Sequence, residues 1–520
     1  MNSLKTHHHE RPAISRVRAL FGIDSRSLAV FRMAVGTLLL IDLSIRSGDL
    51  TTMYSDQGVM PIAVVRQQLA GTWCWSLHFF HGSPFFQATL FIVAALLAIA
   101  LLFGLYTRIA TIGSWIMLAS IYTRAPYAVN GGDTLLVILL FWSMFLPLGK
   151  TWSLDARRGH ARSNPHYSTS VVLSMGTCAI LIQVFLVFFC TIIFKLVYHE
   201  DLTNLLQGML IWGDYNKPLG KWLLGHPTLT WLLSLMTMGL QLVGPWLLFV
   251  PWRTATFRLF TIAGFVLFHI GTEMTVTVGL FSYIALAAWT LLLPTEFWVA
   301  SCWNPIRRLF SQFTSSNQLR HDSEQTKSGD VHHRRPPFVV TCIVTVCLLF
   351  VILYNVLGLI ERKRGSLTPT AMKRVAEALV LRQKWAMFSK EQPTNIWYVA
   401  QARLVNGKQV DLLRGGRPVE HPTRSSRQPN HRWVKYLQGI NKPRTPEIFR
   451  MIYAQHLFDT WNATHNEAEQ IQLLELLRFR QVIVPESEGA HFATDIFGTV
   501  RAKNTRVEDT IEWDVPWKGP

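Results

Sequence analysis

The sequence predicts a polytopic all-α membrane bundle of about eight helices, followed by a ninth anchor helix and a small extracytoplasmic α+β domain. Three observations support this fold class. Half of the 520 residues are hydrophobic and only 16% are charged, a balance typical of membrane proteins. Apolar segments near the length of a bilayer crossing recur up to about residue 300 and once more near residue 350. The last 160 or so residues mix helical and alternating patterns.

The charge balance fits this class. The chain carries 50 basic and 32 acidic residues, a formal net charge of +18. In a soluble protein this excess would suggest nucleic acid, but here it collects beside apolar segments. We therefore assign it to topology and lipid headgroups, and expect a lipid bilayer and no nucleic acid as partner. The six cysteines show no CxxC or zinc spacing, so no metal is expected.

Nine segments are candidates for crossing the membrane, and each is mostly apolar over roughly 14 to 24 residues. They are Leu28–Ile45, Phe85–Leu105, Ile109–Tyr122, Thr134–Leu148, Val171–Phe194, Leu229–Val250, Phe257–Ile270, Val276–Leu293 and Phe338–Ile360.

Basic residues orient these segments, because loops rich in Lys and Arg stay in the cytoplasm. With the N-terminus inside, the cytoplasmic loops hold Arg108, Lys150 with Arg157, Arg253 and Arg307. The opposite loops hold most acidic groups, and the C-terminal domain falls outside. We expect a multi-pass membrane protein with a cytoplasmic N-terminus.

The expected domain organisation follows from these segments. It comprises a cytoplasmic N-terminal segment (1–27), a transmembrane domain (28–300), a cytoplasmic polar linker (301–337), an additional transmembrane helix (338–360) and an extracytoplasmic soluble α+β domain (361–520). Within the last domain, the spacing of AMKRVAEALVLRQKWAMF, EIFRMIYAQHLFDTW and EAEQIQLLELLRF predicts helices. The alternation of WYVAQARLVNGKQVDLL about Asn406-Gly407 predicts a hairpin.

Lys195 is the first candidate for a functional residue. It ends the apolar run VFFCTIIF and is followed by His199, Glu200 and Asp201. A charged group at membrane depth is costly and therefore a functional hypothesis by default. A lysine at a helix end can also extend its ammonium group to the headgroup region. Both interpretations stay open on the residues alone.

Other polar residues near the predicted outer face have two interpretations each. Asp133 directly precedes TLLVILL, which favours an N-cap. His269, in FHIG, is either a hydrogen-bonding group of a site or a packed core histidine. Tyr54 and Asp56, in MYSDQGVMP, either line an outer pocket or form a turn. Gln241 falls at membrane depth, where an amide can bond a partner but cannot exchange a proton.

Asp42 is predicted to lie deep in the first membrane segment. A carboxylate there needs a partner, and Arg46 stands four residues further along the same helix. The sequence predicts that these two residues pair.

Several blocks together resemble one known family. The blocks are FRMAVGTLLLIDL, DLTTMYSDQGVMP, NGGDTLLVILLFWSMFLPLGKTWSLD, FKLVYHEDLTNLLQG and FHIGTEMTVTVGLFSYIALAAWTLLLPTEFW. In order and spacing they resemble the HTTM (horizontally transferred transmembrane) domain family over about Ser15 to Trp298. This family includes vitamin K-dependent gamma-carboxylase and bacterial proteins, and the chain is similar to the bacterial type, which implies a bacterial inner membrane.

The resemblance implies an activity and roles for particular residues. Lys195 stands where the carboxylase family has the base that deprotonates a reduced quinone, and an apolar environment disfavours the ammonium form that cannot accept a proton. His269 would support it. The implied cofactor is a vitamin K-like quinol, and the implied enzyme a gamma-carboxylase-like lyase. Two differences from the family pattern count against this activity. Asp133 lies near a position where the resemblance suggests histidine, and Gln241 lies where relatives often carry an acid.

Two functional hypotheses follow. The first is a gamma-carboxylase-like or quinol-linked enzyme that modifies an exported peptide or lipid on the outer face. The catalytic residues would be Lys195 and His269, with Asp133, Tyr54, Asp56 and Gln241 in the pocket. The alternative is a non-enzymatic membrane anchor or maturation factor that presents the C-terminal domain to an exported partner. Transport has little support, because no broken helix or paired intramembrane charge recurs between halves.

Overall fold

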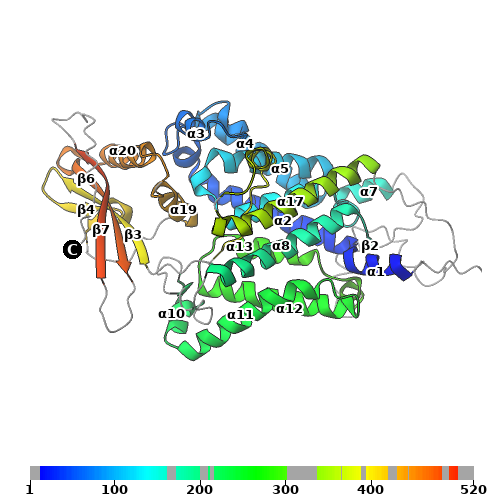
Figure 1. The fold of residues 1–520 in the computed structure, drawn as a ribbon. Coiled ribbons are helices and arrows are strands. Elements are labelled where there is room, and N and C mark those ends of the chain that lie inside the picture. The colour runs from blue at the N-terminus through cyan, green and yellow to red at the C-terminus, as the bar shows by residue number, and fades with distance from the viewer. Residues whose placement is uncertain are drawn as a thin grey trace, which may run out of the picture.

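The computed structural model describes residues 12–160, 171–198, 206, 209–210, 216–300, 337–364, 366–387, 394–419, 430–442, 444–482 and 491–501. Within these ranges the chain forms a helical bundle with a small sheet beyond one end of it (Figure 1). The predicted polar linker, apart from Pro337, and the residues His199, Glu200 and Asp201 lie outside the described residues.

Each of the nine predicted segments contains a helix. These helices are α2 (Ser25–Ser47), α4 (Pro84–Phe103), α5 (Thr107–Arg124), α6 (Gly131–Ser143), α8 (Met175–Tyr198), α11 (Pro227–Leu247), α12 (Thr254–Thr275), α13 (Phe281–Thr290) and α17 (Phe338–Arg364). Five of them, α2, α4, α8, α12 and α17, are long and apolar enough to cross a bilayer, and α6 and α13 are shorter apolar helices. The architecture is that of an integral membrane protein.

Shorter elements connect these helices. They are α1 (Pro12–Phe21), β1 (Ile23–Asp24), η1 (Leu50–Tyr54), α3 (Ile62–Gln68), η2 (Leu77–Phe79), η3 (Pro126–Ala128), α7 (Leu154–His160), β2 (Val171–Val172), α10 (Pro218–Leu224) and α14 (Thr295–Val299). Their ends follow ordinary capping chemistry. Before α4, for example, the Ser83 hydroxyl accepts from the Phe86 amide, and after α4 Gly104 takes a left-handed φ of 67° that ends the helix.

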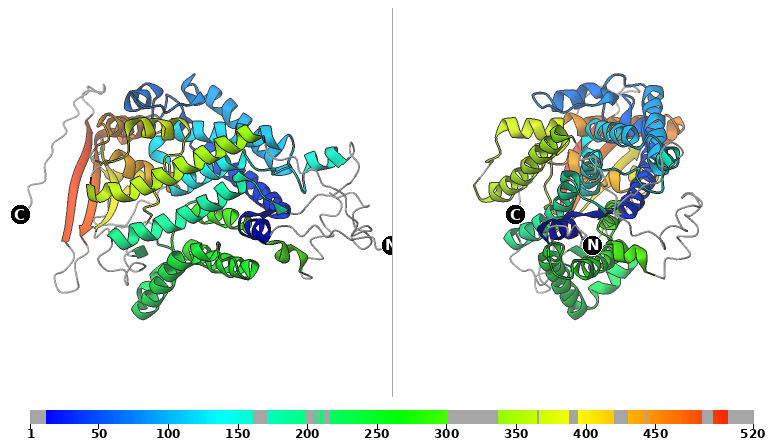
Figure 2. Two further views of the ribbon diagram at one scale, coloured as in Figure 1. Left: turned by 45° about the vertical axis from the view of Figure 1, so that its right-hand side comes forward. Right: turned by 90° about the vertical axis from the view of Figure 1, so that its right-hand side faces the viewer.

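The helix α8 lies inside the bundle. It packs against α6, α11 and α17, while α13 packs against α2, α6 and α12. Figure 2 shows α11 and α12 together at one edge of the bundle. By contrast, α4 turns Ile92, Leu96 and Phe103 outward, exposed by 61%, 60% and 58%. Such exposed apolar side chains fit a lipid-facing surface.

The C-terminal region forms a five-stranded antiparallel sheet of order β5-β4-β3-β6-β7. The strands are β3 (Thr394–Leu404), β4 (Gln409–Asp411), β5 (Arg417–Pro418), β6 (Ile471–Val482) and β7 (His491–Arg501). The predicted hairpin is present: β3 pairs with β4, and Gly407 in the turn has φ 82°. The helix α20 (Ile448–Asn462), also predicted, packs on β6 and β7.

One helix prediction in this region is wrong. From Ile471 onward, the segment EAEQIQLLELLRF forms the long strand β6 and not a helix. Opposite Leu476 and Leu477, the partner strand β7 has one extra residue between Ile496 and Gly498, which is a β-bulge of β7. Leu474 and Leu476 belong to the main core, while Leu477 and Phe479 join Trp397 and Val399 in a separate cluster. A strand buried on both faces carries apolar residues at consecutive positions, and these clustered leucines resemble a helical pattern.

A second predicted helix is shorter in the structure. The helix predicted for AMKRVAEALVLRQKWAMF is α18 (Thr370–Ala378), which ends where Val380 takes a φ of 52°. Beyond it the chain is extended, so that Leu381, Gln383 and Trp385 are buried while Arg382 and Lys384 are exposed. Alternating burial of this kind is typical of an extended segment. The Gln383 side chain accepts from Gln183 of α8, at 2.9 Å.

Candidate functional site

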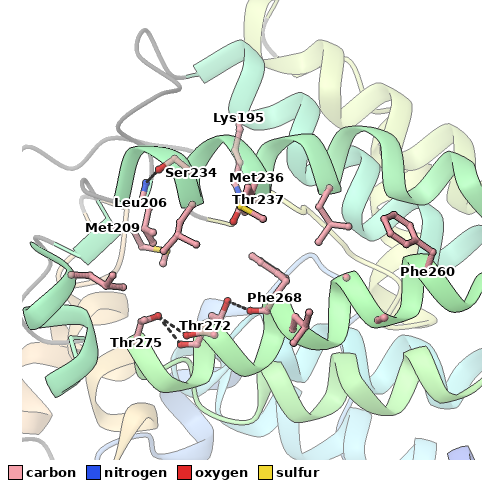
Figure 3. A pocket seen from close by; sticks show the side chains of 17 residues that line it. Lys195, Leu206, Met209, Ser234, Met236, Thr237, Phe260, Phe268, Thr272 and Thr275 are labelled. Carbon is pink, nitrogen blue, oxygen red and sulfur yellow. Dashed lines mark hydrogen bonds between the residues drawn. The ribbon is translucent and has the colours of Figure 1, made fainter. Parts of the chain in front are cut away.

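Lys195 lies in the last two turns of α8, and its side chain is buried inside the bundle. The residue is 4% exposed, and its Nζ donates to Oε1 of Gln241 on α11 at 3.0 Å. Figure 3 shows the lysine reaching from α8 towards a space between α11 and α12. Two sequence-predicted site residues are thus in direct contact, and their helices are neighbours in the bundle.

That space is a cavity of about 510 Å³. Its wall is mainly apolar, and Lys195 is the one charged residue among the described residues that line it. These are Lys195, Leu206, Met209, Leu223, Leu233, Ser234, Met236, Thr237, Leu240, Phe260, Ala263, Gly264, Leu267, Phe268, Gly271, Thr272 and Thr275.

The cavity opens on the side of the bundle. Met236 of α11, and Phe260 and Leu267 of α12, line it and are nevertheless exposed by 63%, 69% and 70%. Two of its hydroxyls are already used: Thr272 donates to the Phe268 carbonyl, and Thr275 to the Gly271 carbonyl. An apolar molecule could therefore reach the amine of Lys195 from the lipid side of these helices.

His269 of α12 is fully buried near this cavity but does not line it. Its ring lies among aromatic rings, with centroid separations of 4.9 Å to Phe268, 5.7 Å to Phe188 and 5.9 Å to Phe281. Neither ring nitrogen has a hydrogen-bond partner within the described part of the chain. A buried polar group without a partner costs about 1–3 kcal/mol, so the imidazole is available to a polar group that enters beside it.

Asp133 stands in a different cluster, at the end of the bundle. It is not the N-cap of α6: Asn130 is the N-cap, and Asp133, three residues on, completes a capping box with it. The Asp133 carboxylate also accepts from Arg46 at 3.1 Å. Arg46 in turn donates to Asp42 at 2.8 Å, which confirms the predicted pair, and to the Tyr54 hydroxyl at 2.6 Å.

Tyr54 and Asp56 separate in the structure. Tyr54 is fully buried in this charged cluster, whereas the side chain of Asp56 is 49% exposed. Asp56 accepts from the Ile62 amide at 2.7 Å and lies 3.8 Å from Arg124. Asp56 therefore shapes the segment before α3, and Tyr54 is the residue of the pair that belongs to a buried site.

One member of the cluster, Arg432, was not predicted from the sequence. It comes from α19 (His431–Ile440) and is only 5% exposed. Its guanidinium donates to both carboxylate oxygens of Asp133, each at 3.1 Å, and to Asp42. The local sequence offered no signal for Arg432, because Arg46 was predicted as the partner of Asp42 alone and the burial of Asp133 beside them depends on the fold.

The surroundings fix the charge of Arg432. Burial and the neighbouring Arg46 act to lower its pKa, but the carboxylates of Asp133 and Asp42 outweigh them, and the pKa rises above its ordinary value. Arg432 is therefore a permanent cation in the folded protein.

The two sites are separate but connected by packing. Lys195 and Gln241 form one, and Asp42, Arg46, Tyr54, Asp133 and Arg432 form the other, which we call the charged cluster. Gly132 lies against the backbone of Phe281, whose ring contacts His269. Among the described residues, no group of three His, Cys, Asp or Glu side chains could hold a metal ion.

Comparison with known proteins agrees with this architecture. The family model described as the HTTM domain matches residues 22–298, more than half of the chain. No curated protein and no solved structure gives a significant match. The match spans α2 to α14, and so includes Lys195, Gln241, His269 and the bundle side of the charged cluster. The chain belongs to the HTTM domain family.

Proposed function

We propose that the protein is a quinol-linked enzyme of the gamma-carboxylase class, with Lys195 as its base. One observation carries this proposal: a cavity that opens sideways on the bundle has a mainly apolar wall and, among its described residues, one buried amine. A base must be reachable by its substrate yet shielded from bulk water. The position of Lys195 Nζ beside Gln241 meets both conditions.

The residues of the cavity fit a reduced isoprenoid quinone. The volume of about 510 Å³ lies within the roughly 300–1,000 Å³ typical of small-molecule sites. The apolar walls of α11 and α12 suit a ring and an isoprenoid chain, and the exposed Met236 and Leu267 give such a chain a path into the lipid. A reduced quinone bound there would be oxidised by molecular oxygen, and that reaction would supply the strong base that carboxylation of a glutamate requires.

The side chains have distinct roles in this proposal. Lys195 Nζ accepts a proton from a hydroxyl group held in the cavity, and the Gln241 amide keeps Nζ directed at the cavity wall. His269, which lacks a partner among the described residues, donates a hydrogen bond to an oxygen that enters beside Phe188 and Phe281. The aromatic rings around it exclude water.

The non-enzymatic alternative has one observation in its favour. The C-terminal domain is fastened to the bundle through Arg432, Trp433 and Asn430 of the α19 region. A bundle that holds a domain this firmly suits an anchor for a maturation factor. Such an anchor needs no amine in a lipid-facing cavity, and for this reason we prefer the enzyme.

Oxygen uptake tests the enzyme hypothesis. The full-length protein in lipid nanodiscs would be supplied with reduced menaquinone, and oxygen consumption measured against quinol and protein blanks. We expect uptake by the parent protein, and loss of it in Lys195→Met and in Lys195→Arg, because arginine keeps the charge but cannot act as a base. Lys221→Met, which removes an exposed lysine of α10, is the matched control and retains uptake.

Two results would contradict the enzyme hypothesis. One is the absence of quinol-dependent uptake by the folded parent protein. The other is full activity of the Lys195→Arg variant, which would reduce Lys195 to a structural charge and favour the anchoring function.

A further inference from the structure

The helix α19 meets the bundle through hydrogen-bond donors. Asn430, its N-cap residue, donates from Nδ2 to Asp49 at 2.7 Å, and the Trp433 indole donates to the same carboxylate at 2.9 Å. One turn further on, the Tyr436 hydroxyl donates to the Val59 carbonyl at 3.3 Å. In each of these contacts the acceptor belongs to the bundle.

Arg432 lies at the centre of this contact. Its two terminal nitrogens face the two oxygens of Asp133, each pair 3.1 Å apart, which is the parallel two-bond geometry of a guanidinium and a carboxylate. The same nitrogens also reach Asp42 and the Ala128 carbonyl. A planar group with fixed donors matches this set of acceptors, and an ammonium group matches it poorly.

The described bundle residues around Asp42 and Asp133 carry more negative than positive charge. With α19 docked, Asp42 and Asp133 are 1% and 3% exposed, and their cation among the described bundle residues is Arg46. Two carboxylates with one guanidinium leave one excess negative charge. A charge buried without a counter-ion is strongly destabilising, so a helix that covers this end of the bundle must supply a second cation.

We propose that the end of the bundle formed by Asp42, Asp133 and the Ala128 carbonyl is a binding site for a guanidinium group presented by a helix. In this chain the site is occupied by Arg432 of α19. The site is distinct from the Lys195 cavity, and the proposal does not depend on the enzyme hypothesis. Its consequence is that α19 docks as a ligand and thereby sets the position of the C-terminal sheet beyond the end of the bundle.

Hydrogen exchange of the α19 amides measures this docking in the full-length protein. In nanodiscs, Arg432→Ala is compared with Arg444→Ala, which removes an exposed arginine that follows α19. We expect exchange of the α19 amides to rise by about thirtyfold or more in Arg432→Ala, as for other buried charge pairs that lose one partner. Arg444→Ala exchanges like the parent protein.

Chemical rescue then tests which group the site binds. Methylguanidinium at millimolar concentration should restore much of the protection of the α19 amides in Arg432→Ala and leave Arg444→Ala unchanged. Methylammonium at the same concentration and ionic strength should restore little, because it lacks the planar pair of donors.

Three outcomes would overturn the proposal. They are unchanged protection of α19 in Arg432→Ala, equal loss of protection in Arg444→Ala, and rescue by methylammonium as strong as that by methylguanidinium. If Arg432→Ala does not fold, Arg432→Lys replaces it, because it keeps the positive charge. Faster exchange in that variant supports a guanidinium site, and protection equal to that of the parent protein contradicts one.

Discussion

Four charged side chains contact one another inside the protein and are almost completely buried. Arg46 bonds Asp42 and Asp133, and Arg432 bonds the same two carboxylates from the far end of the chain. Together they are neutral. Such a group is stable when complete and costly when one member is removed, since the remaining charges keep the burial penalty without their partner.

The charge balance gives a prediction about paired substitutions. Arg432→Met should lower the free energy of unfolding by about 3–5 kcal/mol, because it leaves a net negative charge buried. Adding Asp42→Asn in the same chain should recover part of that loss, since the carboxylate and the guanidinium then disappear together. Denaturant or thermal unfolding in detergent measures the difference, with Arg444→Met as the surface control.

The double variant decides whether charge balance is the cause. If Arg432→Met with Asp42→Asn is less stable than Arg432→Met alone, the loss comes from packing and hydrogen bonds rather than from the excess charge.

Individual residues of both sites were recognisable from the sequence, and their pairing was not. Lys195 was conspicuous because it ends an apolar run, and Gln241 because it is an amide at membrane depth, where it can bond a partner. That these two bond each other depends on α8 packing beside α11, which a local pattern does not encode. Arg432 lies 299 residues from Asp133, in a segment whose local pattern is that of an ordinary surface helix.

At the scale of elements, the helix predictions were confirmed where hydrophobic runs were long. They were wrong where contacts with distant parts of the chain determine the local conformation. The strand β6 was predicted as a helix because its clustered leucines resemble a helical period, whereas burial on both faces of the sheet produces the same pattern. The helix α18 was overextended because the segment after it inserts Gln383 and Trp385 into the bundle as an extended chain. Burial by a distant element overrides local propensity.

The docking of α19 should depend on pH through His431. Burial, and then the nearby Lys435, lower the pKa of His431 to about 4, with Arg432 acting in the same sense and Asp133 opposing. When α19 is undocked, His431 titrates near its ordinary value of about 6.5. A lowered pKa of a histidine means that the stability of docking is complete above about pH 6.5 and is lost as the pH falls towards 4.

Exchange of the α19 amides at pH 7 and pH 5, corrected for the intrinsic pH dependence of exchange, checks this. We expect about tenfold more opening at pH 5 in the parent protein and a clearly smaller change in His431→Gln. An equal change in both proteins would assign the effect to another titrating group.

At the scale of the whole molecule, the bundle and the C-terminal domain form one body joined through α19 and the segment around Gln383. Basic loops predict that the N-terminus lies in the cytoplasm and the C-terminal domain outside. Cysteine accessibility tests this orientation. In a background without native cysteines, Arg444→Cys should react with a membrane-impermeant maleimide on intact cells, and Arg108→Cys only after permeabilisation; both arginines are exposed. The reverse pattern would invert the topology.

The central claim is that the cavity beside Lys195 takes a quinone from the bilayer, and binding of a photoreactive menaquinone analogue tests it most directly. Two glycines offer a matched pair of variants. A Cβ atom added at Gly271 or at Gly239 would meet nothing within 4 Å, but of the two only Gly271 lines the cavity. We predict that the analogue labels the α11 and α12 peptides and that unlabelled quinone prevents this labelling. The Gly271→Leu variant should lose the labelling, and the Gly239→Leu variant should keep it. Labelling scattered over the lipid-facing helices, and equal in the two variants, would contradict it.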